Sequence, residues 1–518
     1  MPGRCASGHP TPCQQPKGRP DAASCCDCIG VCRRPCDAPT GRMRHPRAAD
    51  HAQSATRADP ADRDGPGPGP RRCHAGPAFH PCPRHATGLA PCRPHHPITM
   101  TAFFHRQDGA LAVEQVPLAR IAAEFGTPTY VYSRAALTAA YQAYAAACQG
   151  RKAQVQYAMK ANSNLAVLQV FAKLGAGFDI VSGGELKRVL AAGGDPRKVV
   201  FSGVGKSAAE MELALAHDVR CFNVESIPEL DRLNEMAGRM GKRARVSLRI
   251  NPDVDAKTHP YISTGLKGNK FGIAFEDVLP TYRAAAALPH LEVTGIDCHI
   301  GSQITEVEPY LEALDKVLDV VEALERDGIR LEHIDVGGGL GITYTDETPP
   351  DITGFATTLL ERVAARGHGH REVLFEPGRS LVGNAGVLLT QVEFLKPGAA
   401  KNFCIVDAAM NDLARPAMYE AYHRIEPVVR RDAQAVTYDI VGPVCESGDW
   451  LGRDRALAVQ PGDLLAVMSA GAYGFTMSSN YNTRPRAAEV MVDGATVHLV
   501  RERELVEDLF RDERLLQD

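Results

Sequence analysis

Short runs rich in β-branched residues alternate with amphipathic stretches over much of this chain, and the alternation restricts the fold more than any other feature. It begins at Gln154, ends at Phe375 and repeats eight times. Repeated strand–helix units are typical of parallel α/β folds and not of sandwiches or helical bundles. Eight units over roughly 220 residues predict a TIM-like (β/α)8 barrel. The predicted strands are Gln154–Met159, Gly177–Val181, Lys198–Ser202, Arg220–Val224, Ala244–Ile250, Leu291–Cys298, Leu331–Val336 and Arg371–Phe375, each followed by a helix except the last.

The pattern changes after about Leu381 to strands separated by turns, which predicts a C-terminal all-β domain. Its clearest hairpin joins Val490–Val492 to Thr496–Val500 through Asp493-Gly494. An early strand at Thr129–Tyr132 is expected to pair with this domain. Two barrel helices are also distinct, one with a stripe of Leu165, Leu168, Val170, Phe171 and Leu174, and one opened by Pro309-Tyr310-Leu311. The predicted divisions are 100–133, a barrel over 134–380 and a β-domain over 381–518.

The first 99 residues differ in kind from the rest. They hold ten of the fifteen cysteines and thirteen arginines against one lysine, but only five Leu, Ile, Val or Phe residues. Such a segment cannot bury enough apolar surface to fold. The cysteines from Cys25 to Cys36 lack two Cys-x2-Cys pairs, so no metal site is predicted. Either the segment is a disordered tail, or translation starts at Met100.

Composition excludes several classes of partner. With 44% apolar residues the chain is expected to be globular. Its formal charge of −4 gives no positive electrostatic field that would attract nucleic acid. No run reaches the about 20 apolar residues that cross a bilayer, and the N-terminus lacks the apolar core of a secretory signal. The expected partner is a small molecule, and the expected location is the cytoplasm.

Unusual side chains stand where the predicted strands end, which is where barrels of this kind carry their chemistry. Lys160 ends the first strand, Asp179 lies in the second and His299 follows the sixth. Taken singly, Lys160 could be a solvated lysine and His299 a structural histidine. Their joint occurrence at strand ends predicts an active site. Four further strand-end residues are Ser202, Glu225, Arg249 and Asn251.

Glycine-rich turns follow the last two predicted strands. The seventh strand leads into Gly337-Gly338-Gly339-Leu340-Gly341, and the eighth into Glu376-Pro377-Gly378-Arg379. Exposed backbone N–H groups in such turns can bind phosphate. A dinucleotide fold would require Gly-x-Gly-x-x-Gly and a later acidic residue, and neither is present here. The turns therefore favour a phosphate group bound at the mouth of the barrel.

Five separated motifs carry a family resemblance from about Met100 to the end of the chain. They resemble the alanine-racemase-like group of pyridoxal-phosphate-dependent decarboxylases, and within it most closely the diaminopimelate decarboxylase family. The motifs are Tyr157-Ala158-Met159-Lys160-Ala161-Asn162, Cys298-His299-Ile300-Gly301-Ser302-Gln303, the glycines 337–339, Glu376-Pro377-Gly378-Arg379 and Cys445-Glu446-Ser447-Gly448-Asp449.

The resemblance implies a role for each matching residue. Lys160 would hold the cofactor covalently, Glu376 would face its ring nitrogen, and His299 would lie against its ring. Cys445 would be the proton donor, although it could instead be a small buried apolar residue. Because this segment comes from the partner subunit in the family, a homodimer with active sites at the interface is implied. The remaining cofactor-binding residues implied are Asp179, Ser302, Gly337, Gly338, Gly339, Pro377, Gly378, Arg379 and Tyr473.

The substrate implied is meso-diaminopimelate, which would lose carbon dioxide to give L-lysine in lysine biosynthesis. Its second amino-carboxylate needs both a cation and an anion in the pocket. Arg379, Arg415, Tyr419, Glu446 and Tyr473 match the family's substrate contacts. Alternatives left open are decarboxylation of ornithine, arginine or carboxynorspermidine, alanine racemization, and a non-catalytic carrier of pyridoxal phosphate.

Overall fold

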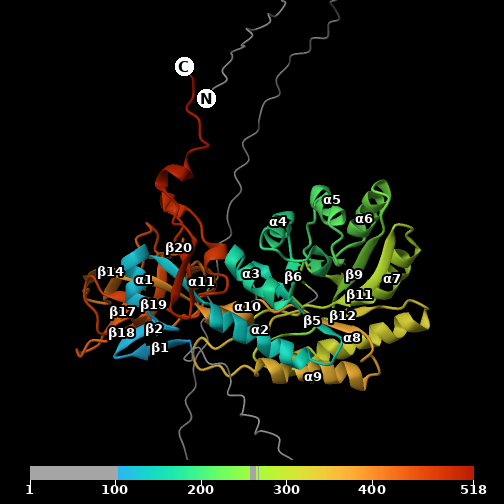
Figure 1. Cartoon of the computed structure of the whole chain (residues 1–518), viewed down its shortest axis with the longest axis horizontal. Coiled ribbons are helices and arrows are strands. Elements are labelled where there is room, and N and C mark those ends of the chain that lie inside the picture. Colours follow the sequence, from blue (N-terminus) through green and yellow to red (C-terminus); the bar gives the residue numbers. More distant parts are fainter. Residues whose placement is uncertain (1–102, 257–263, 266–267, 518) are drawn as a thin grey trace, which may run out of the picture. The chain divides into compact units, whose positions relative to one another are not determined.

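Eight parallel strands close into a barrel in the computed structural model, which describes residues 103–256, 264–265 and 268–517 (Figure 1). Each strand pairs with its neighbours in the order of the chain, and the pairing of the last strand with the first completes the ring. The barrel prediction is therefore confirmed. The strands are β5 (Ala153–Ala158), β6 (Gly177–Ile180), β7 (Val199–Phe201), β8 (Cys221–Val224), β9 (Ala244–Asn251), β11 (Leu291–Asp297), β12 (His333–Asp335) and β13 (Glu372–Phe375), with the short β10 (Ile273–Ala274) beside β9.

The predicted strand limits agree with these to within two residues. The largest difference is at the seventh strand, where only residues 333–335 pair with both neighbours. Lys160 lies just beyond its strand, in the single turn η2 (Met159–Ala161). The residues of the upstream segment, 1–99, lie outside the described part of the chain.

Helices cover the outside of the barrel and bury one face each against it. Helix α3 buries Leu168, Val170 and Phe171, but Leu165 is 44% exposed because it is the first residue of the helix, so the predicted stripe was wrong at that position. Helix α8 begins with Pro309 in its first turn, as predicted. The barrel helices are α3 (Leu165–Leu174), α4 (Gly183–Ala191), α5 (Ala208–Ala216), α6 (Ile227–Arg239), α7 (Val278–Ala287), α8 (Glu308–Arg326), α9 (Ile352–Ala365) and α10 (Arg379–Val382).

The eighth long helix of the ring precedes the first strand instead of following the last. Helix α2 (Arg134–Cys148) packs between α9 and α3 (Figure 1). Ser133 caps its first turn by accepting a hydrogen bond from the amide of Ala136. Because α2 fills this position, the last strand can be followed by a helix of only four residues, which starts in the glycine-rich turn.

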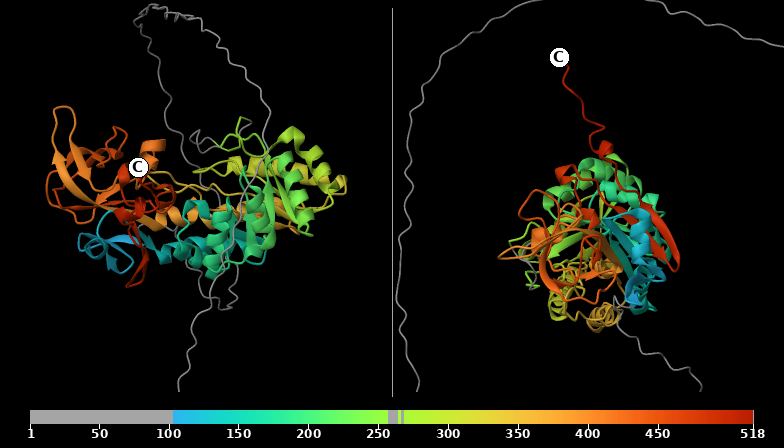
Figure 2. Two further views of the ribbon diagram at one scale, coloured as in Figure 1. Left: turned by 90° about the horizontal axis from the view of Figure 1, so that it is seen from above. Right: turned by 90° about the vertical axis from the view of Figure 1, so that its left-hand side faces the viewer.

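A strand-rich region lies beside the barrel (Figure 2). In it β4 (Thr129–Ser133) pairs with both β14 and β20, so the segment before the barrel joins strands that follow it. The predicted hairpin is present as β20 and β21. The strands after the barrel are β14 (Gly386–Lys396), β15 (Phe403–Val406), β16 (Ile425–Pro427), β17 (Val436–Val441), β18 (Trp450–Leu457), β19 (Leu464–Val467), β20 (Ala488–Asp493) and β21 (Thr496–Arg501), with α11 (Arg415–Tyr419) among them. The elements before β4 are β1 (Phe104–Gln107), β2 (Ala110–Val113), β3 (Val116–Pro117) and α1 (Leu118–Phe125).

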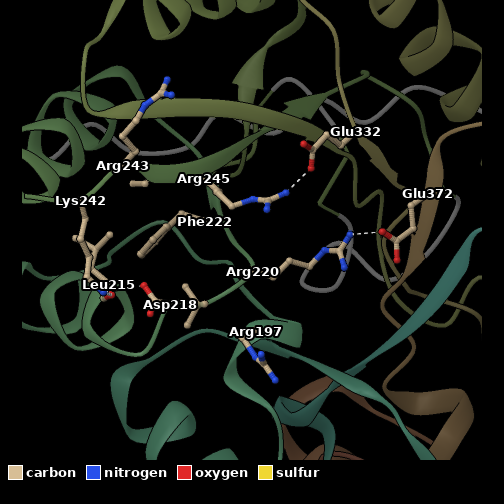
Figure 3. A pocket seen from close by; sticks show the side chains of 12 residues that line it. Arg197, Leu215, Asp218, Arg220, Phe222, Lys242, Arg243, Arg245, Glu332 and Glu372 are labelled. Carbon is tan, nitrogen blue, oxygen red and sulfur yellow. Dashed lines mark hydrogen bonds and ion pairs between the residues drawn. The ribbon is translucent and has the colours of Figure 1, made fainter.

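The amino ends of the barrel strands surround a charged pocket of about 460 Å³ (Figure 3). Arg220 bonds Glu372 at 2.5 Å, which links the starts of β8 and β13 across this end of the barrel, and Arg245 pairs with Glu332. Such ion pairs at the amino end of a barrel serve its stability, because the chemistry of this fold lies at the other end. Within the described residues no helix is long and apolar enough to cross a membrane.

Candidate active site

Lys160 stands at the carboxyl end of the barrel and contacts the neighbouring strand. Its Nζ lies 2.5 Å from Oδ2 of Asp179 in β6. Burial opposes the charged ammonium, but the carboxylates of Asp179 and Glu376 outweigh that effect and raise the pKa of Lys160. The lysine side chain is 36% exposed, whereas that of Asp179 is fully buried. A lysine in this position is accessible to a ligand and is held in place by a buried carboxylate.

His299 follows β11 and faces the glycine turn after β12. Its Nδ1 accepts a hydrogen bond of 3.1 Å from the amide of Gly338. An accepting Nδ1 carries no proton, so a neutral ring must carry its proton on Nε2. Burial, together with the charges of Arg249 and Lys160, lowers the pKa of His299 well below its ordinary value. The ring is therefore a neutral flat surface at the barrel mouth.

The glycines of the turn are required by close backbone contacts. A Cβ on Gly338 would lie 2.0 Å from the carbonyl oxygen of Glu376, and one on Gly337 would lie 2.5 Å from that of Cys298. Gly337 and Gly339 also have φ of 67° and 106°, which favours glycine. The turn consequently packs between the segments that follow β11 and β13.

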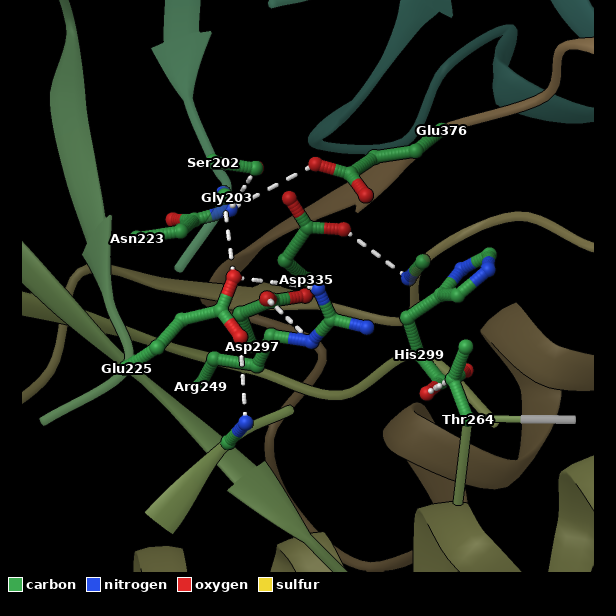
Figure 4. A network of polar contacts seen from close by, with 12 residues as sticks. Ser202, Gly203, Asn223, Glu225, Arg249, Thr264, Asp297, His299, Asp335 and Glu376 are labelled. Carbon is green, nitrogen blue, oxygen red and sulfur yellow. Dashed lines mark hydrogen bonds and ion pairs between the residues drawn. The ribbon is translucent and has the colours of Figure 1, made fainter. Parts of the chain in front are cut away.

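Glu376 belongs to a buried group of carboxyl side chains (Figure 4). Its Oε1 accepts a hydrogen bond of 3.4 Å from Asn223. Its carboxylate, that of Asp297 and that of Asp335 have oxygens within 4.8 Å of one another. Burial, then the charges of Asp179, Asp335 and Asp297, raise the pKa of Glu376 well above its ordinary value. The site therefore has an excess of buried negative charge.

Two arginines meet at one tyrosine on the other side of the mouth. Arg379 donates 2.6 Å to the hydroxyl of Tyr344, and Arg415 donates 2.9 Å to the same oxygen. Arg379 also donates 3.0 Å to Ser302 and lies over the ring of Tyr473, 4.9 Å from its centroid. Both guanidinium groups are buried. Two desolvated guanidinium groups within one small volume are suited to binding carboxylate or phosphate.

Five of the predicted residues lie in the strand-rich region, and they are Arg415, Tyr419, Cys445, Glu446 and Tyr473. Cys445 is exposed, in the loop between β17 and β18, and Glu446 beside it hydrogen-bonds Tyr481. Tyr419 ends α11, the helix that Arg415 begins. Within the part of the chain that the structure describes, no hydrogen bond or ion pair joins Cys445 or Glu446 to Lys160.

Known proteins resemble this chain over most of its length. Residues 134–383 match the family model described as pyridoxal-dependent decarboxylase, pyridoxal binding domain. A diaminopimelate decarboxylase of Vibrio cholerae is 58% identical over 419 residues, which cover 81% of this chain and all of that protein.

The chain belongs to the diaminopimelate decarboxylase family.

Solved structures of this family have the same fold. The enzyme of Helicobacter pylori, complexed with L-lysine, has 42% identity and a TM-score of 0.73, over 76% of this chain and 98% of the other. The enzyme of M. jannaschii, in complex with L-lysine, has 39% identity and a TM-score of 0.77, over 81% and 99%.

The residues present fit pyridoxal phosphate, the cofactor of the family. Lys160 offers an accessible amine beside a carboxylate, as a covalent link to an aldehyde requires. The carboxyl group of Glu376, in an acidic and buried setting, would be stabilised by a protonated ring nitrogen. These two features lie at the same end of the barrel, so one ligand can meet both.

Several site residues were not predicted from the sequence. Tyr344 and His423 hold Arg415, since His423 Nε2 lies 2.9 Å from the arginine Nη1. Asp297 and Asp335 stand two residues before His299 and Gly337, inside strands, where alternation places them toward the barrel interior. Asp297 and Asp335 could have been found because each is an acidic residue inside a predicted buried strand. Nothing in the sequence distinguished Tyr344 or His423.

Proposed function

We propose that this chain is a pyridoxal-phosphate-dependent decarboxylase that converts meso-diaminopimelate to L-lysine and carbon dioxide. The observation that carries the proposal is the joint position of Lys160, Asp179 and Glu376 at one barrel mouth, in a chain that spans the whole length of its relatives. When bound, pyridoxal phosphate supplies an electron-withdrawing ring that accepts the electron pair left by the departing carboxyl group.

Lys160 holds the cofactor. Its ammonium must lose a proton before the amine can bond to an aldehyde, and the oxygen of Asp179 at 2.5 Å is the nearest acceptor. Asp179 also fixes the direction of the lysine side chain because it is itself fully buried.

Glu376 and His299 set the electronic and steric surroundings of the ring. Glu376, as an anion, keeps a ring nitrogen protonated, while the neutral His299 packs against the ring without adding a competing charge. We assign the phosphate to Ser302, Tyr473, the glycines 337–339 and the turn Pro377-Gly378-Arg379, where backbone and hydroxyl donors are available.

Cys445 donates the proton that replaces the lost carboxyl group, and it does so from a second copy of the chain. Its exposure in the strand-rich region supports this assignment, because a donor used by another subunit must be accessible at the surface. A thiol is suited to the task since its ordinary pKa lies closer to neutrality than that of a hydroxyl. The functional unit would then be a homodimer, whose active sites each need both chains.

Arg379 and Arg415 select the substrate by its second carboxylate, with Tyr419, Tyr473 and the partner's copy of Glu446 completing the pocket. The two buried guanidinium groups support this assignment because diaminopimelate carries one carboxylate more than ornithine at its far end. The division into a barrel over 134–380 and a β-domain over 381–518 and the cytoplasmic location stay predictions.

The direct test is an assay of the chain with added pyridoxal phosphate. Lysine formation from meso-diaminopimelate is expected. Parallel reactions with ornithine and with arginine should show no decarboxylation. Activity on ornithine or arginine alone would leave the cofactor site intact and refute the assignment of Arg415 and Glu446. Absence of activity on all three would refute the proposed function.

A further inference from the structure

The interior of the barrel beneath the cofactor site is unusually polar. Barrel interiors of this type are normally filled by branched apolar side chains. Here the apolar cluster inside is small, and comprises Val200, Cys221 and Leu374. Four polar side chains, all buried, come from the strands around it, and they are Gln156, Asn223, Ser247 and His333. The carboxyl groups at the mouth therefore rest on a polar interior that is closed to solvent.

Asp297, Asp335 and Glu376 come from three consecutive strands of the ring. Asp297 and Asp335 are register partners of β11 and β12, and Glu376 follows β13. All three are buried, at 1%, 0% and 5% exposure, and their carboxylate oxygens lie within 4.8 Å of one another. Three negative charges at this separation repel strongly in an interior of low dielectric constant.

The cations nearby are too few to compensate these charges. Arg249 lies 3.8 Å from Asp297, but its closer contact is to Glu225 at 3.3 Å. Lys160 is paired with Asp179. Within the described part of the chain, eight ionisable groups interact with Asp297. They are Asp335 from β12, Glu376 after β13, Glu225 after β8, Arg249 from β9, Asp179 from β6, Cys221 from β8, Cys298 after β11, and Tyr282 from α7.

The hydrogen bonds distinguish the members of the cluster. Asp335 accepts the amide of Gly337 at 2.9 Å, and Glu376 accepts from Asn223. Oδ1 of Asp297 and Oδ2 of Asp335 have no donor among the described residues, although both atoms are buried. Buried acceptors without donors are rare in folded proteins. A proton on one of the carboxyl groups would supply the missing donor.

We propose that Asp297 keeps its proton in the working enzyme and directs it at the carboxylates of Asp335 and Glu376. Asp297 is thus a positioning residue. Its neutral acid leaves Asp335 as the anion that holds Gly337, and so the start of the glycine turn, and leaves Glu376 as the anion that faces the ring nitrogen. This role rests on the proposed function through the assignment of Glu376.

The titration behaviour of the pair agrees with this geometry. Burial and the charge of Asp335 raise the pKa of Asp297 well above its ordinary value, against the opposing effect of Arg249. Burial also raises the pKa of Asp335, to about 7, with the Gly337 hydrogen bond opposing it. A group whose pKa is higher in the folded state binds more protons there than in the unfolded state. Asp297 therefore makes the free energy of unfolding fall as pH rises above the pKa that this group has in the unfolded chain.

Infrared spectroscopy of the holoenzyme tests the proposal directly. The difference spectrum between the wild type and Asp297→Asn at neutral pH should contain the carbonyl stretch of one protonated carboxyl group. A difference spectrum that instead contains only ionised carboxylate bands overturns the proposal. This readout needs no substrate, so its failure is separate from a failure to form lysine.

The pH dependence of thermal unfolding gives a second, independent readout. Between about pH 5 and about pH 8 the melting temperature of Asp297→Asn should rise by several degrees relative to the wild type, since the variant lacks the acid that resists ionisation. The matched control is Asp439→Asn. The carboxylate of Asp439 lies 2.8 Å from Lys401, and the pKa of this carboxylate is lowered. Its difference from the wild type should stay constant over this range, and a constant difference for Asp297→Asn as well would overturn the proposal.

A third variant keeps the test decisive if Asp297→Asn does not fold. Asp335→Asn removes the carboxylate that most raises the pKa of Asp297 after burial. In this variant the carboxylic acid band should disappear at a lower pH than in the wild-type holoenzyme. A band that titrates at the same pH in both proteins overturns the assignment.

Discussion

At the residue scale, the contact between Lys160 and Asp179 distinguishes one lysine from the other lysines of the chain. Most lysines lie on the surface in contact with solvent, but Lys160 stands at a strand end beside a buried carboxylate. Its neighbours Met159 and Ala161 are buried, so the turn that carries it is held in place on both sides. A reactive amine is thereby fixed in direction while remaining accessible.

Replacement of this lysine should remove covalently bound cofactor. In Lys160→Ala, reduction with borohydride is expected to trap no pyridoxal phosphate on the protein, because the bonding amine is gone. Mass spectrometry of the reduced protein measures this. Lys152→Ala, at an exposed lysine just before the same strand, is the control and should retain one cofactor per chain. Trapped cofactor in Lys160→Ala would identify a different lysine.

Replacement of Arg415 should reduce the selectivity for diaminopimelate over ornithine more than it reduces the turnover of ornithine. Arg415→Ala removes a buried guanidinium group, and loss of a charged hydrogen bond of this kind costs about 2 kcal/mol, or roughly thirtyfold in kcat/KM. The ratio of kcat/KM for diaminopimelate to that for ornithine should fall by this factor. Arg453→Ala, at an exposed arginine stacked on Trp450, should leave the ratio unchanged. An unaltered ratio in Arg415→Ala would remove the argument for the carboxylate clamp.

At the element scale, the strands of the barrel could be predicted to within two residues, whereas the ring of helices could not be completed. Short runs of β-branched residues between amphipathic stretches mark strands locally, so the eight strands of the closed barrel were evident from the sequence, whereas the short β10 was not. The position of α2 was not, because a helix before the first strand and a helix after the last have the same local pattern. The packing of α2 against α9 and α3 decides its position in the ring, and the residues next to α2 in the sequence carry no information about that packing.

A buried ion pair joins the loop after β7 to helix α6 and should contribute strongly to stability. Lys206 is fully buried, and its Nζ lies 2.7 Å from Glu229 and 2.8 Å from the carbonyl oxygen of Gly203. Lys206→Ala leaves Glu229 buried without its cation, and such a change costs about 3 to 5 kcal/mol. Urea unfolding measures the loss.

The control for this variant is an ion pair near the surface. Lys401→Ala breaks the pair with Asp439, in which the lysine is half exposed, and surface pairs of this kind contribute roughly 0.2 to 1 kcal/mol. Equal losses in the two variants would mean that Lys206 has no special place in the fold.

At the scale of the whole molecule, the exposed position of Cys445 bears on the proposal that each active site needs two chains. The thiol is exposed in the loop before β18, while Lys160 stands at the barrel mouth. If the donor comes from a second copy, two different inactive variants can restore one another. Cys445→Ala alone should lower kcat by about 10² to 10⁴, the usual contribution of a proton donor.

Mixing of two variants tests this arrangement. Lys160→Ala and Cys445→Ala, mixed in equal amounts and allowed to exchange subunits, should recover about a quarter of the wild-type activity, because half of the dimers of this C2 assembly are mixed and each then holds one intact site. Each variant incubated with itself is the control. Mixtures that stay inactive after subunit exchange is demonstrated would place donor and lysine on the same chain.

The barrel and the family follow from the sequence by itself, and so does the proposal that Lys160 holds the cofactor. Strand–helix periodicity is local, and the motifs around Lys160, His299 and Glu376 are contiguous, so neither requires knowledge of distant contacts. Only the tertiary structure decided that Tyr344 joins Arg379 to Arg415, and that Asp297, Asp335 and Glu376 share one buried space. These groups are separated by dozens of residues along the chain. Their protonation and pairing depend on burial and on charges from other strands, which arise only when the barrel closes.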